Sequence, residues 1–206
     1  MARRQRPRWV VAAAVALAGL VACSDVRAGD APLRAVDVTA GEGGAPVPLD
    51  SALALFRRDL SPATALEHSA PSIPLLIERF ARSIEQSDTA AIREMVMSRR
   101  EFAYLYYPSS PFTRPPTKQE PGLAWFLHLQ PSRKGVTRLF NRFGGRPFRV
   151  LSNECKSSPR AEGENVIWDD CLQSVTDGRD TVTMRLFHGI YERAGRFKIF
   201  SYSNDL

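Results

Sequence analysis

The three histidines are the side chains best suited to acid–base chemistry or metal binding, and they stand far apart at positions 68, 128 and 188. That spacing offers no metal-binding cluster, and neither a metal nor a cofactor is expected. His188 could act as a base at the wall of a pocket, because imidazole titrates near neutral pH. The alternative is a core histidine that hydrogen-bonds to one neighbour.

A second group of side chains could line the mouth of a pocket. The stretch 108–121 contains five prolines, and long loops of this kind are often functional or disordered. Aromatic residues and a histidine stand on both sides of it, although aromatic residues at such spacing can equally belong to the core or its rim. The candidate ligand-pocket residues are Tyr104, Trp125, His128 and His188, with Tyr106 beside them.

The neighbouring carboxylates Asp169 and Asp170 do not form a catalytic pair. Adjacent residues of a strand point to opposite faces of the sheet, which separates the two side chains. Asp170 is better explained by an ion pair with Arg185. No other set of residues matches a catalytic signature.

Cys155 and Cys171 flank a predicted hairpin loop around Gly163 and should lie on neighbouring strands. Outside the cytoplasm two such cysteines are expected to form a disulfide, which would stabilise the fold by about 3 kcal/mol in the chain-entropy model. Free buried thiols and a redox pair are the alternatives, but the chain contains no CxxC motif.

The N-terminus has the features of an export signal. Basic residues at positions 3, 4, 6 and 8 precede an apolar run from Trp9 to Val21. A helix of about 13 residues is too short to cross a bilayer of about 30 Å, but that length suits the apolar region of a signal peptide.

The stretch Leu20-Val21-Ala22-Cys23 resembles the lipobox of bacterial lipoproteins. The resemblance implies that Cys23 carries a diacylglyceryl group on its sulfur, that the chain is cut before Cys23, and that the new N-terminus is acylated, for example with palmitate. Several acyl chains would hold the protein firmly on a membrane. Ser24 weakly favours the outer membrane. The alternative is an ordinary secretory signal with a cysteine near its cleavage site.

Removal of residues 1–22 changes the charge of the protein. The full chain has a formal net charge of +6, but four arginines and no acidic residue leave with the signal. The remaining 24 basic residues nearly balance 22 acidic ones. Nucleic-acid binding is therefore not expected.

The mature chain divides into three parts. Residues 23–48 are rich in Ala, Gly, Pro and Asp, which indicates a lipid anchor followed by a flexible tether. Residues 49–71 contain a short helix and a linker. Residues 72–206 form a single α+β domain in which helices pack on a curved antiparallel sheet.

The sequence predicts that the first half of this domain is helical and contains one strand. Ser72 is the expected N-cap of a helix that buries Leu76, Ile77, Phe80 and Ile84, and Ser87-Asp88 starts a second helix that runs to about Arg99. The β-forming residues of 101–107 predict a strand. A third helix should fill about 122–143, perturbed near Pro131 and ended by Gly144-Gly145.

Residues 146–206 predict four antiparallel strands joined by tight turns. A turn at Asp177-Gly178 would place Trp168 opposite Phe187 and Asp170 opposite Arg185, and a turn at Ala194-Gly195 would place Ile190 opposite Ile199. In this register Trp168, Phe187 and Tyr202 form one aromatic row. The opposite, aliphatic face is expected to meet the helices.

This order of elements resembles the nuclear transport factor 2-like (cystatin-like) superfamily over about 72–206. The stretches 75–81, 87–91 and 195–203 carry the resemblance. It implies a cone in which a curved sheet wraps a long helix around a pocket. The superfamily includes isomerases, dehydratases and hydrolases as well as non-catalytic members that bind ligands, and no catalytic set of its enzymes matches this chain.

The sequence thus predicts a non-catalytic protein of the cell envelope, anchored to a membrane by lipid. Its cone domain would bind a small apolar ligand or another envelope protein. One alternative is an acid–base enzyme, a hydrolase, isomerase or dehydratase that uses His188. Another is a structural homodimer that associates through the aromatic row.

Overall fold

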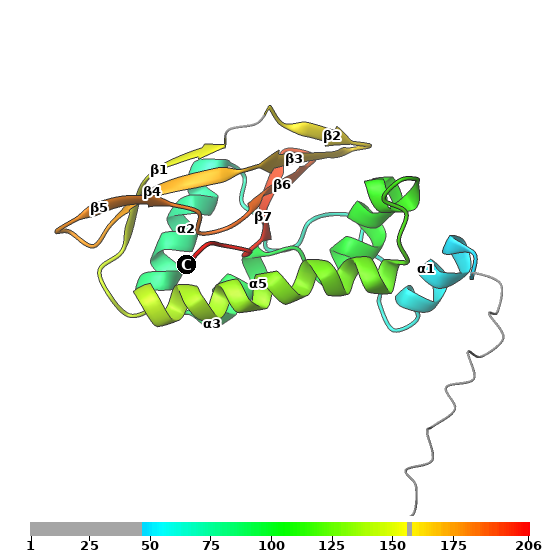
Figure 1. Ribbon diagram of the computed structural model, residues 1–206, viewed down its shortest axis with the longest axis horizontal. Coiled ribbons are helices and arrows are strands. Elements are labelled where there is room, and N and C mark those ends of the chain that lie inside the picture. The colour runs from blue at the N-terminus through cyan, green and yellow to red at the C-terminus, as the bar shows by residue number, and fades with distance from the viewer. Residues whose placement is uncertain (1–46, 156–157) are drawn as a thin grey trace, which may run out of the picture. The chain divides into compact units, whose positions relative to one another are not determined.

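The computed structural model describes residues 47–155 and 158–206. Within these residues the protein is α+β, with five α-helices and two antiparallel sheets (Figure 1). The predicted signal peptide, Cys23 and all but the last two residues of the tether lie outside the described residues. The α-helices are α1 (Leu49–Arg57), α2 (Ile73–Glu85), α3 (Thr89–Met95), α4 (Arg99–Glu101) and α5 (Pro121–Phe143).

Helices α2 and α3 begin where their caps predict. The Ser72 hydroxyl accepts a hydrogen bond from the backbone N–H of Leu75, and the Asp88 carboxylate accepts one from that of Ala91. The predicted apolar stripe of α2 is buried, which confirms that helix. Helix α3 ends at Met95 rather than near Arg99, because the next residue, Val96, is extended and bridges to the last strand.

The strand predicted at 101–107 is wrong, because this segment is helical. Ser98 and Glu101 form a reciprocal capping box that starts α4, and a π-helical turn (Phe102–Tyr106) and a 3₁₀ turn (Tyr107–Ser109) follow it. Three of the four aromatic side chains that suggested a strand, Phe102, Tyr106 and Tyr107, are buried in this helical segment. Aromatic residues favour strands because they pack well on a partly buried surface. A helix in the core offers them a surface of the same kind.

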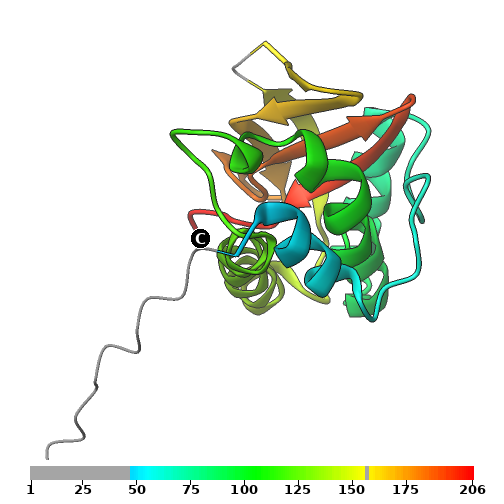
Figure 2. The ribbon, with the colours of Figure 1, turned by 90° about the vertical axis from the view of Figure 1, so that its right-hand side faces the viewer.

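The proline-rich loop leads from these turns into α5. It contains one more 3₁₀ turn, Pro111–Thr113, and Figure 2 shows the loop in green, reaching the start of α5, which is seen nearly end-on. Helix α5 is continuous through the exposed Pro131, so the predicted interruption does not occur. It ends at Gly144-Gly145 as predicted, and Gly145 has a positive φ of 71°.

The described strands form two sheets, whereas four strands in one sheet were predicted. One sheet has the order β1-β4-β5 and the other the order β2-β3-β6-β7. Asp170, with a positive φ of 52°, separates β3 from β4 at a point where the sequence predicted one strand. The strands are β1 (Arg149–Cys155), β2 (Arg160–Glu162), β3 (Asn165–Asp169), β4 (Cys171–Thr176), β5 (Thr181–Met184), β6 (Gly189–Arg193) and β7 (Arg196–Ser201).

Of the two predicted hairpin registers, one is confirmed and the other is shifted by two residues. The turn at Ala194-Gly195 is confirmed, since Ile190 pairs with Ile199. The turn after β4 is longer than predicted, because the Asp177 carboxylate accepts hydrogen bonds from the backbone of Arg179 and Asp180 and widens the loop. Val175 therefore pairs with Val182, two residues from the predicted register, a shift that preserves the faces of the strands.

The predicted exposed row of aromatic side chains is wrong. Trp168 pairs with Ile190 rather than with Phe187. Phe187 and Tyr202 are completely buried, and their rings lie 5.6 and 6.1 Å from the ring of Phe80 on α2. Because these two side chains belong to the core, they cannot form the surface of a dimer.

Two long-range links hold distant elements together. Cys155 and Cys171 pair directly across β1 and β4 and form the predicted disulfide. Lys198 on β7 lies 2.8 Å from a carboxylate oxygen of Glu101, and both side chains are buried, with exposures of 2% and 0%. In Figure 1 both sheets lie on one side of α5, with α2 against β1 and β7.

Candidate functional site

A cavity of ≈ 580 Å³ lies beneath the proline-rich loop. The loop, α5 and the ends of strands β3 and β7 form its walls. Its lining combines apolar surface with several titratable groups. The lining residues are Tyr106, Pro111, Phe112, Thr117, Gln119, Ala124, Leu127, His128, Arg160, Asp169, His188 and Phe200.

His188 and Asp169 meet at this cavity. The backbone N–H of His188 donates to the carbonyl of Ser201, although the strand register pairs Ser201 with the next residue, Gly189. His188 Nε2 lies 3.6 Å from Asp169 Oδ1, and the histidine side chain remains 40% exposed. A Cβ atom at Gly189 would lie 2.4 Å from the carbonyl oxygen of Trp168, so this close approach of β6 to β3 requires glycine.

Arg160 places a positive charge between two carboxylates at the cavity. Its guanidinium pairs with Asp169 at 3.0 Å and also with the buried Glu162. Burial raises the pKa of Tyr106 to about 12, and the neighbouring Arg160 and Asp169 act on it in opposite senses. The Tyr106 hydroxyl therefore stays protonated at neutral pH and can donate a hydrogen bond.

His128 is held among aromatic rings. Its ring stacks on Trp125 at 5.6 Å and meets the edge of Phe200 at 4.9 Å. Burial of the ring lowers the pKa of His128 to about 4, while its contact with the backbone of Phe200 acts in the opposite direction. The imidazole is therefore neutral at physiological pH.

Two polar atoms of this cavity's lining residues are buried without a partner. His128 Nε2 and Gln119 Oε1 have no hydrogen-bond partner among the residues that the structure describes. Buried polar atoms are almost always satisfied in folded proteins, so each such exception requires an explanation. Both atoms have almost no accessible surface, so they lie behind the wall of the cavity rather than facing it.

The sequence-based candidates divide into two groups. His128 and His188 line the same cavity, whereas Tyr104 and Trp125 are not among its described lining residues. The Tyr104 hydroxyl donates to the carbonyl of Leu60, and the guanidinium of Arg57 lies over its ring, so this side chain fastens α1 to the domain. The indole ring of Trp125 stacks on the imidazole ring of His128.

Sequence reasoning missed Gln119, Arg160 and the contribution of Asp169 to the site. Asp169 was not expected to belong to a site, because the adjacent carboxylate of Asp170 points to the opposite face of the predicted strand. Its actual partner, His188, is 19 residues away in the chain and reaches it through the pairing of β3 with β6. Gln119 and Arg160 carry no local pattern that distinguishes them from surface residues.

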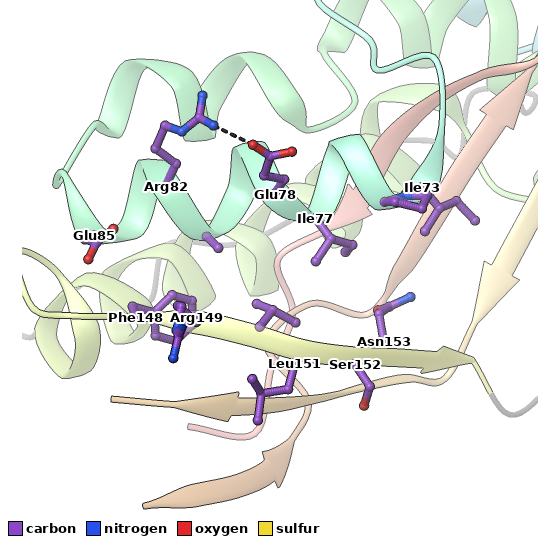
Figure 3. Close-up of a pocket in the computed structure, with 13 residues that line it drawn as sticks. Ile73, Ile77, Glu78, Arg82, Glu85, Phe148, Arg149, Leu151, Ser152 and Asn153 are labelled. Carbon is purple, nitrogen blue, oxygen red and sulfur yellow. Dashed lines mark hydrogen bonds and ion pairs between the residues drawn. The ribbon is translucent and has the colours of Figure 1, made fainter. Parts of the chain in front are cut away.

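A second cavity of ≈ 580 Å³ lies between α2 and β1, an edge strand of the described three-stranded sheet (Figure 3). Ile77, Phe148 and Val150 contribute apolar surface to it. Glu78 and Arg82 stand at its helical side and pair with each other at 2.5 Å. Its described lining contains no histidine, cysteine or buried polar atom without a partner, so it offers fewer means to recognise a specific ligand.

No protein-family model, curated protein or solved structure matches the chain. Among residues 47–155 and 158–206, no helix has the length and apolar character needed to span a membrane. The same residues contain no group of three or more His, Cys, Asp or Glu side chains that could hold a metal ion. The geometry of the cavity is therefore the main guide to function.

Proposed function

We propose that the protein is anchored by lipid in the bacterial cell envelope and that its domain, a cone of the nuclear transport factor 2-like kind, binds a small, largely apolar ligand. The cavity beneath the proline-rich loop, whose wall includes the apolar side chains of Phe112, Leu127 and Phe200, carries this proposal. The volume of that cavity falls within the roughly 300–1,000 Å³ of small-molecule sites. A second envelope protein is the alternative ligand.

The anchor is supported by the lipobox-like stretch that ends at Cys23 and by the disulfide between Cys155 and Cys171. Disulfides persist in oxidising compartments such as the periplasm. In cells fed radiolabelled palmitate, label should enter the protein and be lost in the Cys23→Ser variant. Equal labelling of the two proteins would contradict the anchor.

We expect Leu127→Asp to weaken binding of an apolar probe by about tenfold or more, because it places a charge on the apolar wall of the cavity. The measurement is a fluorescence titration with N-phenyl-1-naphthylamine. The protein is the chain from residue 23 onward with Cys23→Ser, which lacks both the apolar signal and the site for lipidation.

Leu123→Asp is the matched control. Leu123 and Leu127 lie one turn apart on α5 and are similarly exposed, at 51% and 49%, but only Leu127 is among the described lining residues. The control variant should bind the probe as the parent chain does. Equal losses in both variants, or no binding by the parent, would contradict the proposed function.

The second candidate function is acid–base catalysis, favoured by the contact between His188 and Asp169 at the same cavity. In ester hydrolysis His188 would take a proton from water as the water oxygen attacks the carbonyl. The acid and the alcohol would then leave as products. Asp169 would orient the imidazole and stabilise its charged form.

For this candidate we expect His188→Gln to reduce hydrolysis of p-nitrophenyl acetate by about 100-fold, the lower range for loss of a general base. His68→Gln is the control, because His68 also lies 3.6 Å from a carboxylate, that of Glu94, but does not line this cavity. Hydrolysis no faster than in buffer, or unchanged in the His188 variant, would leave ligand binding as the function.

A further inference from the structure

Most of the large apolar side chains that are exposed to solvent gather in one region of the domain. Among the described residues eight such side chains are at least 41% exposed, and five of them belong to α1, the residues just before it, or the first turns of α5. These five form the apolar patch: Val47, Leu55, Leu123, Phe126 and Leu127. Single exposed apolar side chains are ordinary, but a gathered set marks a surface that meets a protein, a ligand or a membrane.

The two halves of the apolar patch belong to one surface. Val47 and Leu55 line the same hollow as the first two residues of α5. Phe126 follows the second of these two residues by four positions, so it lies one turn further along the same side of the helix. Figure 1 shows α1 beside the start of α5.

Helix α1 is fastened to the domain although none of its nine residues is fully buried. The guanidinium of Arg57 donates to the carbonyl of Ala103 at 2.6 Å and lies over the ring of Tyr104. These contacts fix the helix against the segment that follows the capping box. Its exposed apolar side chains are therefore held at the surface, and the apolar patch exists before any partner binds.

The chain itself indicates which partner the apolar patch meets. Val47 is both a member of the patch and the first described residue, and only residues 24–46 separate it from Cys23. Even fully extended, these residues span no more than about 80 Å, so a lipid on Cys23 would keep the patch near the bilayer. The tether enters the domain at this surface, and a tethered contact is effective even when it is weak, because it forms within one molecule.

The charges around the apolar patch do not favour a strongly charged partner. The exposed charged residues within or next to α1 and just before α5 include both signs: Asp50, Arg58, Asp59, Lys118 and Glu120. Attraction between charges therefore contributes little, and apolar contact is the interaction that this surface offers.

We propose that the apolar patch is a membrane-docking surface, which lies on the bilayer that holds the lipid anchor and inserts Leu55, Leu123 and Phe126 among the lipids. Interfacial helices bind in this way, with their apolar side chains buried about 5–10 Å into the boundary between headgroups and acyl chains. The inference rests on the proposed function for the anchor. Leu127 also lines the cavity beneath the proline-rich loop, so that cavity lies beside the docking surface.

The test is co-sedimentation with sucrose-loaded vesicles of phosphatidylethanolamine and phosphatidylglycerol. The protein is the chain from residue 23 onward with Cys23→Ser, so that no lipid anchor contributes. This parent chain should sediment with the vesicles, and added salt should not release it, because apolar insertion is not screened. Leu123→Asp and Phe126→Asp should each lower the partition coefficient by about tenfold or more, since each removes a large apolar side chain from the contact.

Leu151→Asp is the matched control. Leu151 is 56% exposed, against 51% for Leu123, but it belongs to β1, which lies far from α1 in Figure 1. This variant should sediment as the parent chain does. Leu123→Asp should also bind N-phenyl-1-naphthylamine normally, which separates docking on the membrane from binding in the cavity.

Each other outcome contradicts a different statement. If the parent chain does not sediment, or if Leu151→Asp loses as much as Leu123→Asp, the docking surface is wrong, while the probe titration still decides the ligand of the cavity. A parent dimer that ignores vesicles and that Leu123→Asp dissociates would show that the apolar patch joins two copies. If the vesicles bind the parent chain but palmitate does not label the protein, the anchor is wrong and the docking surface stands.

Discussion

Lys198→Met should lower the free energy of unfolding by about 3–5 kcal/mol, the usual effect of removing one partner from a buried ion pair. Both side chains of the Lys198–Glu101 pair are buried. Without the lysine, the Glu101 carboxylate keeps only its hydrogen bonds from the backbone N–H groups of Glu67 and Ser98. A buried carboxylate without a counter-charge is the source of the loss.

Urea denaturation of the parent and variant chains measures this effect. Arg82→Met is the control, because its ion pair with Glu78 is more than half exposed and should contribute less than about 1 kcal/mol. If Lys198→Met does not fold, the double variant Lys198→Met, Glu101→Gln should recover part of the stability, since no buried charge is left unpaired. Equal losses for Lys198→Met and Arg82→Met would contradict the assignment.

The stability of the protein should fall by about 3 kcal/mol between pH 6.5 and pH 4 because of His128 alone. Burial lowers the pKa of His128 from 6.5 to about 4 in the folded state. Within that window only the unfolded chain binds the proton, so stability rises with pH and is fully present above pH 6.5. Below about pH 4 both states are protonated and this contribution is constant.

The measurement is urea denaturation of the parent chain and of His128→Phe at pH 7, 5.5 and 4.5. The difference between the two proteins should change with pH, because the variant has no proton to bind at this position. His68→Gln, on the exposed surface, should retain the slope of the parent. A His128→Phe variant whose pH dependence equals that of the parent would show that His128 is not buried in its neutral form.

The elements predicted well are those set by short-range interactions. Ser72 and Asp88 cap their helices through residues three positions ahead, and the turn at Ala194-Gly195 brings Ile190 opposite Ile199. The prediction of a strand at 101–107 was wrong because it used the aromatic composition of the segment alone. The capping box of Ser98 and Glu101 marks the start of a helix there.

The candidate site could be predicted only in part, because it forms from separate segments. His128 and His188 were recognisable as chemically capable residues, but the helix and sheet that bring them to one cavity are set by tertiary packing. The positive φ of Asp170 divides a predicted strand between two sheets and changes which residues neighbour Trp168. Gln119 lines the cavity only because the proline-rich loop folds over it, and no sequence pattern records that arrangement.

The position of β7 has a consequence for the timing of folding. This strand is the last of the described strands along the chain, yet it bridges to Ala70 and Val96 and supplies Lys198 to the buried Glu101. The helical half of the domain is therefore completed only after the six preceding described strands have been synthesised. A nascent chain that still lacks β7 cannot pair Lys198 with Glu101 and cannot close this part of the core.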